Sequence, residues 1–147
     1  MEADFSVIML GEPVYENAFL PIIILKEISL SGYINGYHEY RSKWVPVIHE
    51  ELKAEMEPDN IKDKYAMSVM RNGEIVGHIQ KGIAGNFAKN IFYFLRADKM
   101  SECYAIVSGN PVNLGDQKGM RVPCIFRLTG QPSFIEKMKS IMEKHVQ

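Results

Sequence analysis

The polar residues that could do chemistry are concentrated in one turn-rich stretch, residues 57–81. Asp63 and Asn60 lie in a loop that contains Pro58, where proline and Asx side chains favour turns. In this loop Asp63 could accept a hydrogen bond from a sugar hydroxyl, and Asn60 could read a base edge. Because a carboxylate repels phosphate, the loop suits a free hydroxyl end of a nucleic acid. The alternative is an Asx turn in which both side chains satisfy only their own backbone.

Basic residues lie on both sides of this loop. Lys62 and Lys64 could approach phosphates. His78 and Lys81 precede a predicted helix, whose first N–H groups carry partial positive charge, so together they could hold one phosphate. The alternative for His78 is a surface residue that is hydrogen-bonded to a carbonyl.

Aromatic residues upstream of the loop could stack unpaired bases, an interaction worth roughly 1–3 kcal/mol per base. They are Tyr37, His38, Tyr40 and Trp44. Aromatic residues near the start of a strand are as often part of the core, so the sequence leaves both roles open.

Nothing in the chain indicates catalysis or a cofactor. No Ser or Cys lies in a recognisable nucleophile turn, and residues 82–85 are too short for a phosphate loop. Metal-ligand spacing is absent among the histidines, which are His38, His49, His78 and His145.

The composition is that of one globular domain. The chain has 147 residues, of which 46% are hydrophobic and 24% charged. No apolar run approaches the roughly 20 residues that span a bilayer, and the start around Glu2 and Asp4 lacks the basic region of a signal peptide. We therefore expect an intracellular protein with no membrane partner. Cys103 and Cys124 fall at alternating apolar positions, which favours buried hydrophobes over a disulfide or metal ligands.

The charge is unevenly distributed. A net charge of −1 argues against a strongly basic, non-specific nucleic-acid binder. Residues 1–35 carry one lysine and five acidic residues, a net of −4, and the rest of the chain has a net of +3. A local basic face is therefore compatible with the sequence, although most charge clusters are simply solvated surface.

The clearest structural prediction is a β-hairpin followed by a helix. Apolar residues alternate through Tyr65, Met67 and Val69, and Asn72-Gly73 is the preferred pair for a tight turn. The return strand carries Ile75, Gly77 and Ile79. Helical spacing then predicts an amphipathic helix from Gly82 to about Arg96, with apolar residues Ile83, Phe87, Ile91, Phe94 and Leu95.

Periodicity predicts further strands and one more helix. Residues 19–25 form an apolar run typical of a buried strand, and Pro21 favours an edge position. Alternation predicts strands around Leu52, at 102–108 and at 121–128, and residues 109–119 form a turn or a binding loop. A capping box from Ser133 to Glu136 starts a terminal helix with apolar residues Phe134, Met138, Ile141 and Met142. This pattern predicts a mainly β (α+β) fold, a small barrel with an inserted helix.

Three short motifs occur in a characteristic order. They are Gly-x-x-x-Tyr at residues 36–40, Glu-Pro-x-Asn-x-x-Asp-x-x-Ala at 57–66 and Val-Gly-His-Ile-x-x at 76–81. In this order and spacing they resemble the HIRAN domain, which occurs attached to SWI/SNF-type helicases and in stand-alone proteins. The resemblance covers residues 29–130. It leaves 1–28 as an acidic extension with a possible edge strand, and 131–147 as a helix packed on the same domain.

The resemblance implies a modified, OB-like β-barrel decorated with helices. It also implies a non-catalytic module that binds single-stranded DNA, including its 3′-hydroxyl end, and a nuclear role in DNA repair. The partners would be single-stranded DNA or DNA ends, with other proteins as a further class. The candidate binding residues are His38, Tyr40, Trp44, Asn60, Lys62, Asp63, Lys64, His78 and Lys81.

The chain also departs from the family pattern. Where the family's DNA-end binder has Arg-Tyr and a later Pro-Tyr-Asp, this chain has His38-Glu39 and Ile61-Lys62-Asp63. The aromatic residue that the family has on the late strand falls near Met120 of this chain. The loss of two stacking tyrosines would weaken binding substantially. Tyr37, Tyr40 or Trp44 could compensate. The alternative is a protein-interaction module that keeps the barrel and has lost DNA-end binding.

Overall fold

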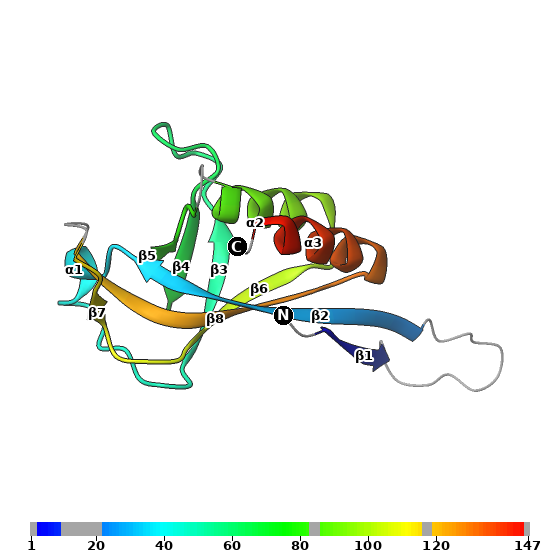
Figure 1. The fold of residues 1–147 in the computed structure, drawn as a ribbon, viewed down its shortest axis with the longest axis horizontal. Helices are drawn as coiled ribbons and strands as arrows, with labels where there is room; N and C mark the ends of the chain where they lie inside the picture. The colour runs from blue at the N-terminus through cyan, green and yellow to red at the C-terminus, as the bar shows by residue number, and fades with distance from the viewer. Residues whose placement is uncertain (1–2, 10–21, 83–85, 116–118, 146–147) are drawn as a thin grey trace.

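Six antiparallel strands close into a small barrel. The computed structural model describes residues 3–9, 22–82, 86–115 and 119–145. The strands follow the order β2-β5-β4-β3-β6-β8, and β8 pairs back onto β2 (Figure 1). They are β2 (Ile22–Asn35), β3 (Glu51–Met56), β4 (Met67–Arg71), β5 (Glu74–Ile79), β6 (Glu102–Val107) and β8 (Met120–Gly130). This confirms the predicted mainly β, OB-like barrel, including the hairpin with positive φ at Asn72 and Gly73.

Two strands lie outside the closed ring. β1 (Ala3–Met9) pairs with the first half of β2, and β7 (Val112–Asn113) pairs with β8 inside the predicted loop. Within the predicted run 19–25, the described residues 22–25 pair with β1 on one side only, because β8 joins β2 from Lys26 onward. Pro21 itself lies outside the described residues.

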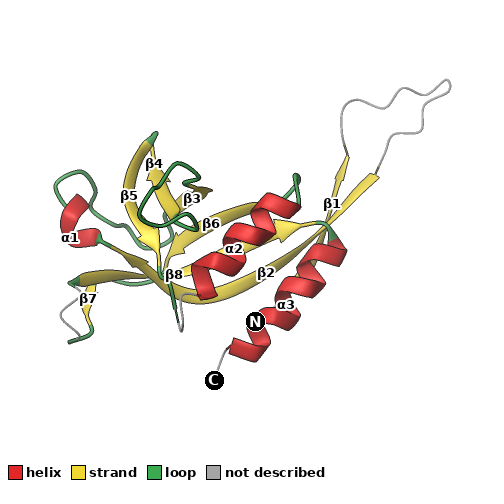
Figure 2. Cartoon of the chain, turned by 90° about the horizontal axis from the view of Figure 1, so that it is seen from above, coloured by secondary structure: helices red, strands yellow, loops and turns green. Residues whose placement is uncertain are grey.

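Two helices lie side by side on one side of the barrel (Figures 1 and 2). α2 (Asn86–Ala97) confirms the predicted inserted helix from Asn86 onward, and Ile83 lies outside the described residues. α3 (Pro132–His145) packs on β2, β8 and α2. The predicted capping box, with Ser133 as the N-cap, was wrong by two residues, because Gln131 precedes the first helical residue. Pro132 takes the first helical position, where a missing N–H costs little, and the carbonyl of Gln131 accepts from Ile135 N at 3.0 Å.

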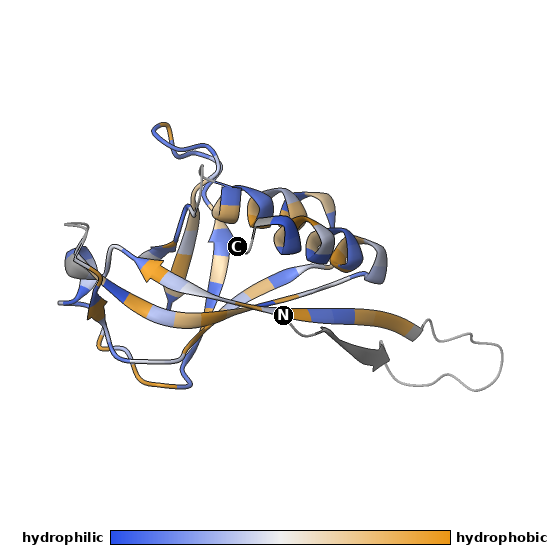
Figure 3. Ribbon diagram, viewed as in Figure 1, coloured by the Kyte–Doolittle hydropathy of each residue, from blue (hydrophilic) through white to orange (hydrophobic). Residues whose placement is uncertain are grey.

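The core lies between the barrel strands and the two helices. Alternate residues of β8 point inward, and apolar residues alternate with polar ones along the strands (Figure 3). Both cysteines are buried and free, as predicted. Burial raises the pKa of the Cys103 thiol to about 12 and also raises the pKa of Cys124. The largest fully buried core side chains include Ile28, Ile34, Met67, Ile91, Phe126, Leu128, Ile135 and Met142.

A buried aspartate fixes the two helices relative to each other. Asp98, only 1% exposed, follows α2, and its Oδ2 accepts a hydrogen bond from the backbone N of Gln131 at 2.8 Å. Its Oδ1 accepts from Gln131 Nε2 at 2.9 Å and from Met100 N at 3.0 Å. A buried carboxylate needs such partners. The end of α2 is thereby tied to the start of α3.

The barrel closes through a very short seam between β2 and β5. The two strands share only the pairs Ile34 with Ile79 and Asn35 with His78. Gly77 lies at this seam, and a Cβ built there would lie 2.4 Å from Ile34 Cγ2 and 2.8 Å from the Asn35 carbonyl oxygen. The glycine of the Val-Gly-His-Ile motif is therefore required for the strands to approach.

We expect Gly77→Ala to destabilise the fold by about 1–3 kcal/mol, because the added methyl group overpacks a buried seam. Urea unfolding measures the change. Gly109→Ala is the matched control, since its nearest neighbour would be the Pro123 side chain at 3.3 Å. Equal effects of the two substitutions would contradict the role assigned to the seam.

Candidate nucleic-acid interface

The loop before β4 is ordered by two Asx side chains. Asn60 Oδ1 accepts hydrogen bonds from the backbone N of Lys62 at 3.0 Å and of Asp63 at 2.9 Å. Asp63 Oδ1 accepts from Tyr65 N at 3.0 Å. Both residues therefore form Asx turns, but their side chains do not satisfy only their own backbone, because Asn60 Nδ2 also donates to Glu57. The second oxygen of Asp63, Oδ2, lies 3.6 Å from Lys81 Nζ.

Glu57 joins this loop to the hairpin. Its Oε2 accepts from Asn60 Nδ2 at 3.0 Å, and its Oε1 lies 2.7 Å from His78 Nε2 on β5. His78 is therefore bonded to a carboxylate and not to a carbonyl, which corrects the alternative drawn from the sequence. We call Glu57, Asn60, Asp63, His78 and Lys81 the loop–hairpin site.

The environment of Glu57 keeps its carboxylate charged. Partial burial acts to raise its pKa, but hydrogen bonds from Asn60 and His78, together with the charge of His78, hold the pKa of Glu57 below its ordinary value of 4.5. Glu57 is therefore an ionised acceptor at neutral pH. The sequence placed it in a motif but did not identify it as a site residue, because its partner His78 is 21 residues away.

Tyr40 lies beside the loop–hairpin site. Gly36 has φ +82°, a left-handed conformation that favours glycine, and it turns the chain from β2 into the short helix α1 (Tyr37–Tyr40). The Tyr40 ring centroid lies 6.4 Å from that of His78. Partial burial and the carboxylates of Glu39 and Glu57 raise the pKa of the Tyr40 hydroxyl.

Trp44 does not belong to this surface. It is 2% exposed, its Nε1 donates to Glu50 Oε1 at 3.0 Å, and Tyr37 packs edge-on against it at 5.9 Å. The prediction that Trp44 stacks a base was wrong, because the indole is a core residue with a satisfied N–H. The side chain of His38 lies outside the described part of the chain.

The predicted lysines are exposed but differ in their surroundings. Lys62 is exposed, and the Lys81 side chain is 72% exposed. Lys64 Nζ lies 5.1 Å from the Tyr65 ring centroid. The helix start predicted to bind an anion is partly occupied by the protein itself, since Phe87 N donates to the Lys81 carbonyl at 2.8 Å, and residues 83–85 lie outside the described ranges.

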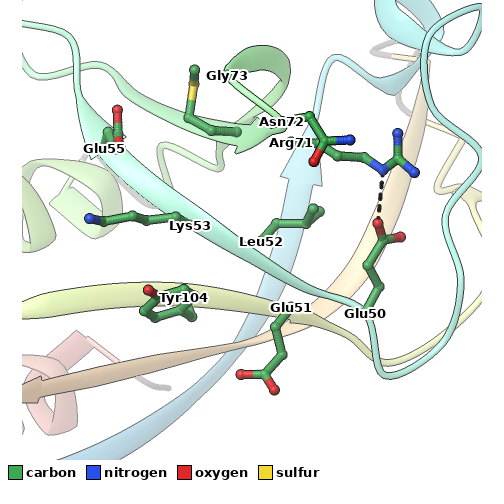
Figure 4. Close-up of a pocket in the computed structure, with 10 residues that line it drawn as sticks. Glu50, Glu51, Leu52, Lys53, Glu55, Arg71, Asn72, Gly73 and Tyr104 are labelled. Carbon is green, nitrogen blue, oxygen red and sulfur yellow. Dashed lines mark hydrogen bonds and ion pairs between the residues drawn. The ribbon is translucent and has the colours of Figure 1, made fainter.

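A separate hollow of about 680 Å³ lies against β3, β4 and β6 (Figure 4). Its charges are partly paired, since Arg71 Nε lies 3.0 Å from Glu50 Oε2. None of the predicted binding residues lines it. Among the residues that the structure describes, no group of three His, Cys, Asp or Glu side chains could hold a metal ion. No helix in the described ranges is long and apolar enough to cross a membrane.

The closed barrel with its short seam, Asx-ordered loop and paired helices is the fold of a HIRAN domain. The crystal structure of the HIRAN domain of human HLTF matches with a TM-score of 0.61 and 23% identity, covering 81% of this chain and 89% of that chain. An NMR structure of the HLTF HIRAN domain matches with a TM-score of 0.57 and 22% sequence identity, covering 80% of this chain and 88% of that chain. The NMR structure of the HLTF HIRAN domain in its DNA-bound conformation matches with a TM-score of 0.53 and 23% sequence identity, covering 80% of this chain and 87% of that chain.

These matches confirm the resemblance predicted from the three motifs at the level of the fold. Neither a known family pattern nor a curated protein matches the sequence itself.

We expect Glu57→Gln to destabilise the protein by about 1 kcal/mol near neutral pH, because His78 and Asn60 lose a charged acceptor. A carboxyl whose pKa is lowered by folding stabilises the fold above its unfolded pKa, and this stabilisation is lost as the pH falls through the folded pKa. The difference in free energy of unfolding between the wild type and the variant should therefore shrink when the pH falls below 4.5, the ordinary pKa of a glutamate.

Urea unfolding at pH 7 and at about pH 3 measures this difference. Glu74→Gln, an exposed change on the same hairpin, is the control. A difference that stays constant between the two pH values would contradict the role of the charged Glu57.

Proposed function

We propose that this chain is a non-catalytic nucleic-acid-binding module that binds single-stranded DNA and holds its free 3′-hydroxyl end. The observation that carries the proposal is the loop–hairpin site. There, an Asx-ordered carboxylate and an exposed ammonium lie 3.6 Å apart, beside an imidazole fixed by Glu57. The shared fold with the HLTF HIRAN domain, which has a DNA-bound conformation, supports it.

Asp63 and Lys81 contact different groups at the 3′ end of the DNA. Asp63 Oδ1 is used by the backbone of Tyr65, so Oδ2 is the oxygen that accepts a hydrogen bond from the terminal hydroxyl. Lys81 moves from Asp63 to the last phosphate, which is a point-charge contact that ammonium groups make well. A phosphate at the terminus would face the Asp63 carboxylate directly, and like charges repel. The site therefore prefers a 3′-hydroxyl to a 3′-phosphate.

His78 and Tyr40 extend the contact by one nucleotide. The Glu57 carboxylate accepts from Nε2 of His78 and sets the ring orientation, which leaves Nδ1, an acceptor in that tautomer, for a hydrogen-bond donor of the nucleic acid. Tyr40, with its ring 6.4 Å from the imidazole, supports the terminal base. In this proposal the cellular setting is nuclear, at DNA ends that arise during repair.

A binding role also fits the reactivity of the described side chains. The two thiols are buried, and the raised pKa of Cys103, about 12, leaves almost no thiolate at neutral pH. The strongest acceptor, Glu57, is engaged by Asn60 and His78. Neither group is available as a nucleophile or a base.

Fluorescence anisotropy with single-stranded oligonucleotides of about 10 nucleotides tests the proposal. We expect tighter binding to a 3′-hydroxyl than to a 3′-phosphate. Asp63→Asn should reduce that preference, because it removes the charge that repels the blocked end. Lys81→Ala should weaken binding to both kinds of 3′ end. It should also reduce the slope of the logarithm of the binding constant against the logarithm of the salt concentration by about one unit.

Lys53→Ala is the matched control, since Lys53 is exposed in the separate hollow on β3. Equal binding of free and blocked ends by the wild type would overturn the 3′-end assignment.

A second candidate function is a protein-interaction module. The observation that favours it is an exposed apolar loop, in which Val45 is 76%, Val47 63% and Ile48 44% exposed. Contiguous exposed apolar side chains are typical of protein interfaces.

If this function is correct, affinity capture from the native cell retains its partners after nuclease treatment, and the double change Val45→Ser and Val47→Ser loses them. Partners that disappear with nuclease alone would contradict this second function.

A further inference from the structure

Two tyrosines form an exposed aromatic pair beside the loop–hairpin site. Tyr65, at the end of the loop, and Tyr93, on α2, have ring centroids 5.3 Å apart, and the Tyr93 hydroxyl donates to that of Tyr65 at 2.8 Å. Tyr65 also packs edge-on against the buried Phe92 at 5.6 Å. The Tyr65 ring is therefore supported by α2 through Phe92 and Tyr93.

Three cations surround this pair. Lys64 Nζ lies 5.1 Å and Lys89 Nζ 4.8 Å from the Tyr65 ring centroid, and the Arg96 guanidinium lies 4.8 Å from that of Tyr93. Within the described residues, none of the three cations is paired with a carboxylate. The hydrogen bond from Tyr93 and the two lysines lower the pKa of the Tyr65 hydroxyl, as expected in a positive field.

Tyr104 also has a neighbouring cation, Arg127, and a comparison with it shows how the charge around Tyr65 and Tyr93 differs. Arg127 lies 5.6 Å from the Tyr104 ring centroid, but Arg127 also forms ion pairs with Glu27 and Glu51. On that surface the cation is offset by carboxylates. The Tyr65–Tyr93 surface has unbalanced positive charge in a chain whose net charge is −1, so it is complementary to a polyanion.

The patch continues into a hollow between the two helices. The hollow, about 370 Å³, is lined by Tyr93 and Arg96 of α2 and by Phe134, Lys137 and Met138 of α3. Its wall is aromatic and aliphatic, and its rim is basic. Asp98 keeps the two helices in register, so the hollow is part of the fixed structure.

We propose that Tyr65 and Tyr93, with Lys64, Lys89 and Arg96, form a second contact surface for single-stranded nucleic acid, and that the hollow between α2 and α3 receives a base. This inference rests on the proposed function, because the strand that crosses this patch is the one whose end lies at the loop–hairpin site. The two surfaces adjoin, since Asp63 Oδ1 accepts from the backbone N of Tyr65 at 3.0 Å.

The chemistry of the patch selects an unpaired strand. Bases stack on tyrosine only when their faces are free, whereas a duplex offers only phosphates and base edges. The phosphates draw the lysines from the Tyr65 ring, which frees its face for a base. Arg96 adds a cation–π contact of the kind found in single-strand binders. An acidic peptide would satisfy the charges but would leave the ring faces and the hollow unused.

Anisotropy with the full chain and single strands of about 10 nucleotides, with free and phosphate-blocked 3′ ends, tests this surface. We expect Tyr93→Leu to weaken binding about tenfold for both ends, so that the preference between them is unchanged. Tyr93→Phe keeps the ring and should bind as the wild type does. Tyr104→Leu, at the surface where carboxylates offset the cation, is the matched control and should also bind normally.

The outcomes separate this inference from the proposed function. If Tyr93→Leu binds like the wild type while Asp63→Asn loses the end preference, this inference is overturned and the proposed function stands. If the wild type shows no end preference but Tyr93→Leu weakens binding, the 3′-end assignment fails and this surface stands. A wild type that binds no single strand overturns both.

Photo-crosslinking of the wild type tests the same surface without a substitution. Strands that carry 5-iododeoxyuridine should crosslink to Tyr65 or Tyr93, as located by mass spectrometry of the peptides. Crosslinks confined to other residues would overturn the assignment.

Discussion

The close approach of β2 and β5 at Gly77 is the constraint on which the rest of the structure depends. Only two residue pairs close the barrel there, and a Cβ at Gly77 would collide with Ile34 and with the backbone of Asn35. Because side chains alternate along a strand, the position of Gly77 also sets that of His78, which lies opposite Asn35. The imidazole reaches Glu57 across β4, where Ser68 pairs with both His78 and Glu55.

Glu57 then converts a local turn into a site. Asx turns order residues 60–65 by themselves, but they do not determine where the loop lies relative to the barrel. The bonds from Glu57 to Asn60 and His78 supply that second constraint, and they use a carboxylate that stays ionised. The resulting surface has mixed charge, with Asp63 next to Lys81. Its recognition must therefore come from geometry more than from net attraction.

The sequence predicted those features that depend on neighbouring residues alone. The Asn72-Gly73 turn, the alternation in β8 and the spacing in α2 follow from φ preferences and periodicity, and the structure confirms them. Asp98 and the pairing of β1 depend on residues far away in the chain, and the sequence does not encode these contacts as a short pattern. Tyr65 and Tyr93 meet only because α2 docks beside the loop, so their proximity was missed.

In the proposed function, the loop–hairpin site and the Tyr65–Tyr93 patch contribute to binding in different ways, and one backbone hydrogen bond links them. Aromatic rings with unbalanced cations favour any unpaired strand, whereas the Asp63 carboxylate distinguishes one kind of end from another. In this arrangement Tyr65 supplies an aromatic ring three residues after Lys62, and that ring packs against Phe92 of α2. The backbone of Tyr65 donates to Asp63 and links the two surfaces. Because this hydrogen bond uses only a main-chain atom of Tyr65, the orientation of the Asp63 carboxylate does not depend on the aromatic side chains.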